Sequence, residues 1–171
     1  RLLLLSLVCV LIAFTSGNDF QVGLVVQTPT GYITRCVNFT TSSQQEYTGL
    51  DVLEFSQIPL NIAGDSSGAG VCAINGTGCF YPQESCFCKC QATTSNIPRK
   101  ATLLRGPSDC QYWSYFHLKD DQWQYAQTGP AEYMVKHGQV EGWRWDQGDQ
   151  KPPKVYSFKE VCSMRAIQPR P

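Results

Sequence analysis

Two stretches near the start of the chain alternate apolar and polar residues and are rich in β-branched and aromatic side chains. They are residues 20–28 (FQVGLVVQT) and 32–39 (YITRCVNF), and stretches of this kind favour β-strands. Pro29, Thr30 and Gly31 separate them, and proline and glycine are typical turn residues. The pattern therefore predicts a β-hairpin.

A short helix is predicted soon after the hairpin. Thr48 can cap its first turn, and Asp51 lies three residues later, as in a weak capping box. Apolar residues then recur at helical spacing as far as Phe55, and Pro59 ends the pattern. The sequence predicts one helix over residues 49–57.

The second half of the chain is again rich in strand-forming residues. Residues 64–70 are expected to form a flexible turn, and Asp120-Asp121 a tight turn between two aromatic strands. Further strands are predicted at residues 70–74, 112–118, 123–127 and 140–145. A hairpin, one short helix and then more strands indicate an α+β domain with a mixed sheet, in the order of a β-grasp domain.

The first residues have the features of a secretory signal peptide. Arg1 precedes an apolar run at residues 2–14, and small residues follow as far as Gly17. The run is shorter than the roughly 20 residues that span a bilayer. We expect residues 1–17 to be removed and the remaining chain to be secreted or held at the cell surface, with no membrane span.

Nine cysteines are present, and five of them fall between positions 72 and 90. Cys9 lies in the expected signal peptide, and the even number that remains favours a disulfide framework in an exported protein. Zinc sites commonly repeat a C-x2-C pair, whereas the clustered cysteines are separated by six, six, one and one residues. The sequence predicts no metal site, and disulfides among Cys36, Cys72, Cys79, Cys86, Cys88, Cys90, Cys110 and Cys162.

The sequence leaves the pairing of these cysteines open, because eight cysteines allow 105 connectivities. Bridges between close neighbours in the run 86–90 are disfavoured, since bridged Cα atoms stand about 5.5 Å apart in a suitable orientation. We expect the three cysteines of this run to reach outward to Cys36, Cys110 and Cys162.

Charge and length narrow the class of protein. Charged residues make up 16% of the chain, and 14 basic residues balance 14 acidic ones. A nucleic-acid-binding protein is expected to carry a basic surplus or stripe, so we expect no nucleic-acid partner. One domain is expected at residues 18–148, followed by a Pro-rich tail at 149–171 that Cys162 ties back.

Aromatic residues are concentrated between positions 112 and 145, a stretch that holds all four tryptophans. Alternation along a strand sends Trp143 and Trp145 to one face and Arg144 to the other. In one interpretation the rings pack in the core and across strands. In the other, an exposed face forms a ligand-binding platform together with Tyr115 and Trp123.

No catalytic constellation is predicted. His117 is expected to be a hydrogen-bonded edge residue and His137 a solvated turn residue. An even cysteine count leaves no free thiol as a nucleophile. Two acidic pairs stand beside turn residues, where aspartate commonly binds backbone groups: Asp120 with Asp121, and Asp146 with Asp149. We therefore expect no enzyme activity.

Six short motifs resemble the exported bacterial members of the DUF4430 family, which is related to the carboxy-terminal β-grasp domain of transcobalamin and intrinsic factor. The resemblance covers about residues 20–148. It implies a β-grasp fold and, for the ligand, cobalamin. The motifs are TGLD at 48–51, GVCAING at 70–76, CFC at 86–88, YWSYFH at 112–117, WQY at 123–125 and GQVEGWRW at 138–145.

The leading hypothesis is a secreted, non-catalytic, disulfide-rich binding or surface domain without a cofactor. Two alternatives stay open. The first is a corrinoid-binding (cobalamin-binding) component of an uptake system, and the second is a subunit of an extracellular assembly or filament that docks onto another protein or onto itself. Asn38 and Asn75 begin N-glycosylation sequons, which matter only in a eukaryote.

Overall fold

The computed structural model describes residues 20–39, 46–65, 68–90, 110–146 and 150–163. The expected signal peptide, residues 1–17, lies outside these ranges, and so does Asp149. Within them the protein is an α+β structure made mostly of strands, with two sheets and two short helices. No helix in these ranges is long and apolar enough to cross a membrane.

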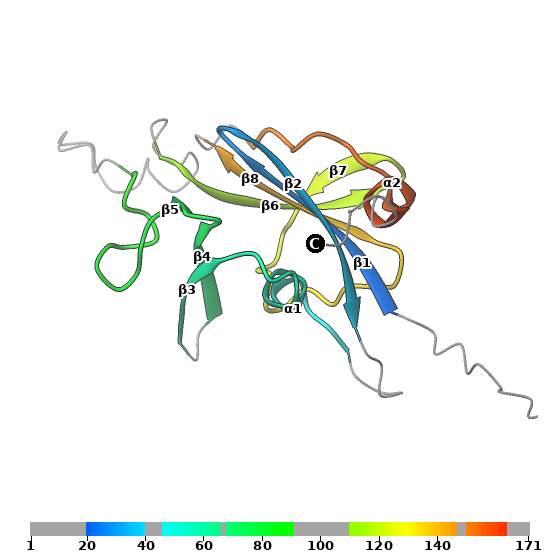
Figure 1. Ribbon diagram of the computed structural model, residues 1–171. Coiled ribbons are helices and arrows are strands. Elements are labelled where there is room, and N and C mark those ends of the chain that lie inside the picture. The colour runs from blue at the N-terminus through cyan, green and yellow to red at the C-terminus, as the bar shows by residue number, and fades with distance from the viewer. Residues whose placement is uncertain (1–19, 40–45, 66–67, 91–109, 147–149, 164–171) are drawn as a thin grey trace, which may run out of the picture.

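The larger sheet has five strands and is mixed (Figure 1). Its central pair, β1 with β8, is parallel, and every other neighbouring pair is antiparallel. In spatial order the strands are β2 (Gly31–Phe39), β1 (Phe20–Thr28), β8 (Val140–Asp146), β6 (Tyr112–Lys119) and β7 (Gln122–Tyr125).

Both hairpins of this sheet are confirmed. Strands β1 and β2 pair along their whole length, from Phe20 opposite Phe39 to Thr28 opposite Gly31. Between β6 and β7, Asp120 and Asp121 have φ angles of 50° and 58°. Two successive left-handed residues are typical of the tight hairpin turn whose twist matches that of the strands.

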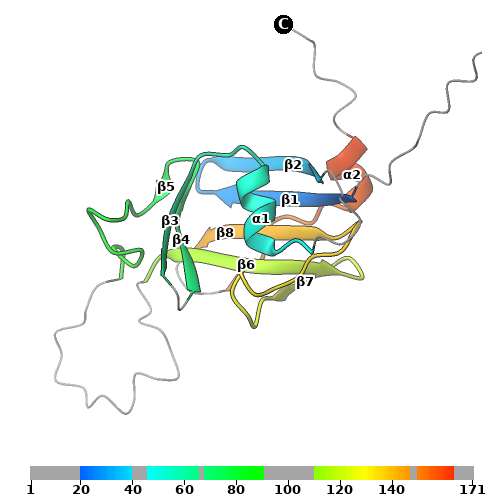
Figure 2. The same cartoon turned by 90° about the horizontal axis from the view of Figure 1, so that it is seen from below.

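Helix α1 (Gly49–Phe55) lies across one face of the large sheet, as Figure 2 shows. The capping box is formed: the Asp51 backbone N–H donates to Thr48 Oγ1 at 3.2 Å, and the Thr48 N–H donates to Asp51 Oδ2 at 2.7 Å. The helix ends two residues before the predicted boundary because Gln57 adopts a left-handed φ of 60°. Val52 and Leu53 are fully buried against the sheet.

The opposite face of the sheet is covered by a second helix, which corrects the expectation of one helix. Helix α2 (Phe158–Ser163) begins at Ser157, whose Oγ accepts from the Glu160 N–H while Glu160 Oε2 accepts from the Ser157 N–H. Val161 packs there against Val25 and Val140. The helix is too short for periodicity to reveal it, because one buried residue sets no repeat.

The smaller sheet has three strands, β3 (Leu60–Asp65), β4 (Gly68–Ile74) and β5 (Thr77–Gly78). Strand β3 was not predicted, and part of it falls in the stretch expected to be a flexible turn. Four of its six residues, Asn61, Ala63, Gly64 and Asp65, have low strand propensity, so β3 forms because β4 pairs with it. Asn75 and Gly76, with φ angles of 49° and 75°, form the turn between β4 and β5.

Four disulfides confirm the disulfide framework: Cys36–Cys162, Cys72–Cys86, Cys79–Cys88 and Cys90–Cys110. The expectation for Cys110 is confirmed by its pairing with Cys90. The expectation that Cys36 and Cys162 reach the cysteine cluster is wrong, because they join each other. Helix α2 packs beside β1 and β2, which brings these two cysteines together across 126 residues of sequence.

Candidate ligand-binding pocket

A pocket of about 980 Å³ lies between the two sheets. Three segments wall it: strands β3 and β4, the cysteine loop (residues 79–90), and the end of the large sheet with the connection at 126–130. Ligand pockets commonly measure about 300–1,000 Å³ and are lined mainly by apolar and aromatic groups. This pocket therefore has the size of a site for a large ligand.

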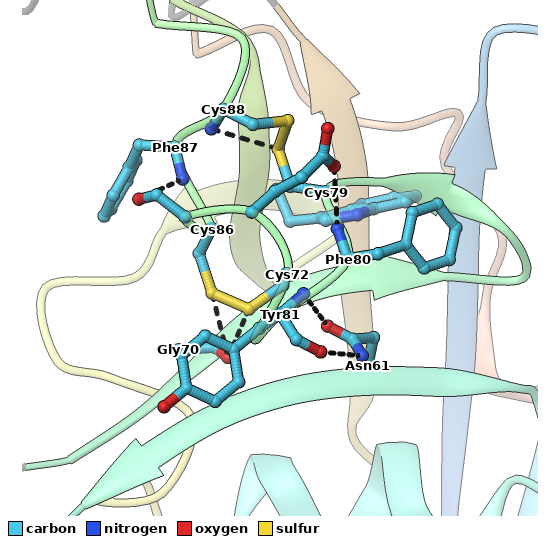
Figure 3. Close-up of a disulfide and its surroundings, with 12 residues drawn as sticks. Asn61, Gly70, Cys72, Cys79, Phe80, Tyr81, Cys86, Phe87 and Cys88 are labelled. Atoms are coloured by element: carbon cyan, nitrogen blue, oxygen red, sulfur yellow. Dashed lines mark hydrogen bonds between the residues drawn. A yellow bond between two sulfur atoms is a disulfide. The ribbon is translucent and has the colours of Figure 1, made fainter.

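The outer wall is the cysteine loop, which Figure 3 shows in close-up. Two disulfides fix it, Cys72–Cys86 to β4 and Cys79–Cys88 across its own base. Asn61 of β3 adds a two-way link, since its Oδ1 accepts from the Tyr81 N–H at 2.8 Å and its Nδ2 donates to the Tyr81 carbonyl at 2.9 Å. The loop is thereby held against β3 and β4 without a core of its own.

Aromatic rings of two kinds line the pocket. On the loop, Tyr81 and Phe87 are 47% and 60% exposed. On the large sheet, Trp113, Tyr115 and Trp143 also line the pocket and are almost fully buried. Trp113 Nε1 also donates to the Thr77 carbonyl at 3.1 Å, which links the two sheets behind the pocket.

The structure brings together only part of the residues that the sequence proposed as a platform. Tyr115 and Trp143 stack at 4.5 Å between ring centroids and both reach the pocket. Trp143 is only 2% exposed, so its indole is not presented to solvent. Trp145 lies on the same face, packed against Trp113 at 5.5 Å. The same-face arrangement of the two indoles is therefore present, but their open exposure is not.

The other two proposed residues lie elsewhere. Arg144 points to the opposite side of β8, donates to the Pro152 carbonyl at 3.0 Å and borders a separate hollow of about 450 Å³. Trp123 packs on the face that α2 covers, over Gly142, where an added Cβ would come within 2.6 Å of the indole. The five residues do not form one surface.

Sequence reasoning missed the loop residues that border the pocket. Tyr81 and Phe87 stand among the clustered cysteines, where attention goes to the disulfides. A signal was present, because large aromatic residues in a polar, cysteine-rich loop are uncommon unless they contact something. Tyr112 and Tyr125 complete the aromatic lining from β6 and β7.

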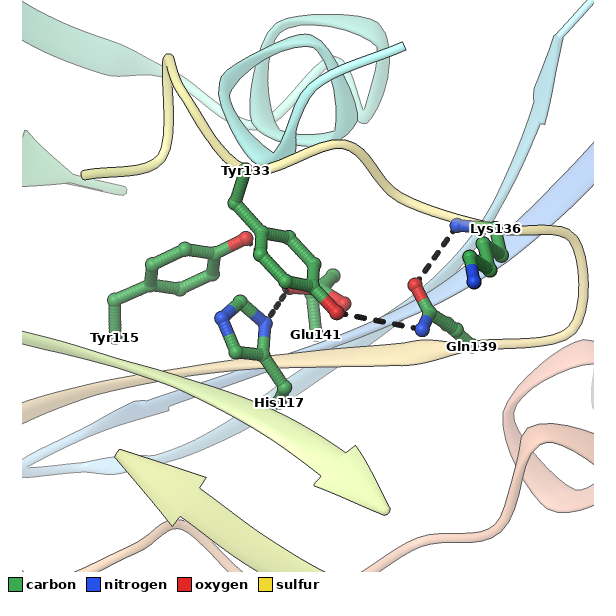
Figure 4. A network of polar contacts seen from close by, with 6 residues as sticks. All are labelled: Tyr115, His117, Tyr133, Lys136, Gln139 and Glu141. Carbon is green, nitrogen blue, oxygen red and sulfur yellow. Dashed lines mark hydrogen bonds and ion pairs between the residues drawn. The ribbon is translucent and has the colours of Figure 1, made fainter. Parts of the chain in front are cut away.

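A polar cluster lies under α1, close to the inner wall of the pocket (Figure 4). The carboxylate of Glu141 is fully buried, and its Oε2 accepts from the Tyr115 hydroxyl at 2.5 Å and contacts His117 Nδ1 at 2.7 Å. The Tyr133 ring stacks on His117 at 3.6 Å, and Gln139 Nε2 donates to the Tyr133 hydroxyl. Glu141 Oε1 has no hydrogen-bond partner among the described residues.

Gly49 makes room for this cluster. A Cβ at Gly49 would lie 1.8 Å from the Tyr115 hydroxyl, so the first residue of α1 has to be glycine for the tyrosine to reach Glu141. The sequence expected His117 to be a hydrogen-bonded edge residue, and it is hydrogen-bonded to Glu141. His137, expected to be solvated, accepts from the Gln21 N–H at 3.1 Å.

Burial keeps several phenols of this region in their neutral form. Burial raises the pKa of Tyr115, and the negative charge of Glu141 raises it further. Burial also raises the pKa of Tyr133. At the pocket, burial and then the neighbouring Tyr112 raise the pKa of Tyr125 to about 12. These hydroxyls are therefore hydrogen-bond donors at any physiological pH.

One cluster of potential metal ligands occurs among the described residues: Cys79, Glu84 and Cys88. Both sulfur atoms belong to the same disulfide, and metal ions bind thiolates. Glu84 Oε2 is engaged by the Phe80 N–H at 3.1 Å. With the disulfide formed, the cluster is a structural link in the cysteine loop.

The fold and the pocket together define a disulfide-linked α+β domain with an aromatic cavity between its sheets. Residues 107–169 are similar to the SCO2322-like domain family. This stretch contains β6, β7, β8 and α2. It therefore includes the inner wall of the pocket and every residue of the polar cluster except Gly49. Comparison with curated proteins gives no match.

Proposed function

We propose that this protein is an extracellular, non-catalytic binding domain whose aromatic pocket receives an apolar group of its ligand. The observation that carries the proposal is the pocket of about 980 Å³ between two covalently linked walls, with exposed aromatic rings on one side. Exposed aromatic rings beside a concave site are typical of binding surfaces, since solvent exposure has no structural benefit for them.

Two further observations support an extracellular place. Four disulfides persist in oxidising compartments and are rare in the cytosol. The expected signal peptide at residues 1–17 gives the route of export. We also infer that the large sheet is of β-grasp type, because its order β2-β1-β8-β6-β7 follows hairpin, helix and further strands with a parallel central pair.

The charge of the pocket lining limits the class of ligand that the pocket can bind. Among the described residues that line the pocket, Glu84 is the only one with a charged side chain. An anionic ligand would need a basic partner to offset its loss of water. A neutral or cationic ligand is favoured.

The buried pair of Glu141 and His117 does not change the non-catalytic proposal. The neighbours of this pair are the phenols of Tyr115 and Tyr133. Both phenols have a raised pKa and therefore stay protonated. A nucleophilic mechanism needs a base in contact with a hydroxyl or thiol that it can activate. We assign the cluster to the support of the inner wall.

Binding of the neutral apolar dye Nile red, followed by its fluorescence, tests the proposal. The purified protein should bind the dye saturably, and Phe87→Ser should weaken binding about tenfold, as expected for a large apolar contact. The matched control is Phe55→Ser on α1, a site 54% exposed and away from the pocket. Equal binding by the two variants, or no saturable binding at all, would refute the proposal.

A corrinoid ligand is the second candidate, favoured by the size of the pocket and by its stacked aromatic floor of Tyr115 and Trp143. Cyanocobalamin should then be retained by the protein through gel filtration and should displace Nile red. The Phe87→Ser variant should retain less of it. A protein that binds the dye but elutes free of corrinoid would exclude this candidate and leave the pocket proposal standing.

A further inference from the structure

On the side of β6 that faces β7, no described strand pairs with the first residues of β6, which lie at the edge of the pocket. Strand β7 pairs with β6 only from Phe116 to Lys119. The last contact on this side is the Ala126 N–H, which donates to the Tyr115 carbonyl at 2.9 Å. Beyond it, the next partner on the way to the start of β6 is Lys89 of the cysteine loop, which bridges to Gln111. Between these two contacts, residues 112–114 of β6 have no described backbone partner on this side, and we call this stretch the gap.

The backbone of Trp113 faces this gap. Peptide groups along a strand point alternately to its two sides, and the Tyr115 carbonyl points toward β7. Pairing of β6 with β8 is regular over this stretch, without a bulge. The N–H and C=O of Trp113 therefore point to the same side as those of Tyr115, into the gap. No other described strand pairs with Trp113 there.

The facing wall of the pocket has a similar opening. Strand β5 pairs with β4 at Ala73 and Ile74, and the Cys79 N–H donates to the Cys72 carbonyl at 2.9 Å. No other described strand pairs on this side with the earlier residues of β4. There the Gly70 carbonyl oxygen lies 3.6 Å from Cys72 Sγ and 3.8 Å from Cys86 Sγ (Figure 3). Disulfide sulfurs carry no proton to donate. Gly70 is exposed and lines the pocket, so its carbonyl can accept a hydrogen bond from a ligand.

We propose that the pocket binds an extended peptide segment, which adds as a short strand to the edge of β6 at Trp113. This inference rests on the proposed function and names its ligand class. The peptide backbone exchanges hydrogen bonds with the N–H and C=O of Trp113, as in other cases of strand addition. One aromatic or branched apolar side chain enters the cavity between Phe87 and Tyr125. Because Glu84 is the only charged residue among the described residues of the lining, neutral or basic flanking residues fit and acidic ones are disfavoured.

A peptide series tests this inference on the full chain. The probe is acetyl-Lys-Val-Phe-Val-Lys-amide, compared with the same peptide N-methylated at phenylalanine and with a version that has glutamate in place of both lysines. Displacement of Nile red gives the affinities, and the ¹⁵N–¹H spectrum reports the Trp113 amide. We expect the parent peptide to displace the dye and shift the Trp113 amide. The methylated and acidic peptides should bind about tenfold more weakly, as expected for the loss of a backbone hydrogen bond or of charge complementarity.

The outcomes separate the two proposals. If Nile red binds and Phe87→Ser weakens it, but the methylated peptide binds as well as the parent, the pocket stands and strand addition is overturned. Displacement by cyanocobalamin with no displacement by any peptide overturns it as well. Strand addition by a separate peptide is also overturned if light scattering shows a dimer at high protein concentration and the dimer no longer binds the dye. The occupant of the pocket is then a second copy of the chain. Failure of the dye itself refutes the proposed function.

Discussion

The two sheets of this protein are held together by different means. The large sheet has buried side chains on both faces, under α1 and under α2, and a single disulfide, Cys36–Cys162. The small sheet and the cysteine loop hold few large buried residues but contain two disulfides, Cys72–Cys86 and Cys79–Cys88, and a third, Cys90–Cys110, joins the loop to the start of β6. Covalent links therefore stand where the chain cannot bury enough apolar surface to fix its shape. The pocket lies where the two kinds of structure meet.

This difference matters for the pocket. Its inner wall, with Trp113, Tyr115 and Trp143, is fixed by the core of the large sheet. Its outer wall, with Tyr81 and Phe87, depends on two disulfides and on Asn61. Loss of a core contact should lower the stability of the whole protein, whereas loss of a loop disulfide should open one wall only. The following changes test that distinction.

Removal of the Cys36–Cys162 disulfide should have the largest effect on stability. It closes a loop with a sequence separation of 126, and loss of such a cross-link is expected to lower the free energy of unfolding by about 4–5 kcal/mol. Denaturant unfolding of the Cys36→Ser/Cys162→Ser protein, followed by tryptophan fluorescence, measures this loss. A change below about 1 kcal/mol would show that α2 is held by packing alone.

Removal of the Cys79–Cys88 disulfide should act locally. The bridge spans a sequence separation of 9, and we expect it to contribute about 2–3 kcal/mol to the order of the loop. In Cys79→Ser/Cys88→Ser, hydrogen exchange should quicken at β4 and β5, and Nile red binding should be lost. Amides of β1 and β8 should keep their protection. Equal loss of protection in both sheets would contradict the distinction between them.

Gly49→Ala should displace Tyr115 from Glu141. The added Cβ would overlap the tyrosine hydroxyl, and we expect a loss of about 1–3 kcal/mol in unfolding free energy, as for other overpacked sites. In the Tyr115→Phe background the same substitution should cost less, because the hydroxyl is gone. Thermal unfolding of the four proteins of this double-mutant cycle measures the coupling. If the effects of Gly49→Ala and Tyr115→Phe on stability are additive, the two residues are not in contact.

The smallest effect on stability is expected from ionisation of the Tyr125 phenol at high pH. Burial raises its pKa to about 12, above the ordinary value of about 10 that applies in the unfolded chain. The stability linked to this neutral phenol is therefore fully present below about pH 10 and is lost as the pH rises through about 12. Ultraviolet titration of phenolate should show a late step that Tyr125→Phe removes. An unchanged titration curve in that variant would reject the assignment.

Local signals in the sequence were sufficient for several elements. The turn at residues 29–31, the capping box of Thr48 and Asp51, and the Asp120-Asp121 turn each depend on neighbouring residues alone. The strands around them were therefore predicted with boundaries that differ by at most two residues from the structure. An even number of cysteines outside the first residues likewise indicated disulfides.

Features that depend on distant contacts needed the tertiary structure. Strand β3 forms only because β4 lies beside it, and Cys36 meets Cys162 only because α2 covers the sheet. Whether Trp143 is exposed or buried was open in the sequence, because strand alternation gives the face of a residue but not what covers that face. Helix α1 covers it.

The sequence by itself thus determined the hairpins, the first helix and the reliance on disulfides, because these follow from neighbouring residues and from composition. Tertiary structure decided the rest. It set which cysteines pair, buried Glu141 beside His117, and placed Tyr81 and Phe87 opposite the edge of β6. These features depend on segments that are far apart in the chain and become neighbours only when both sheets are formed.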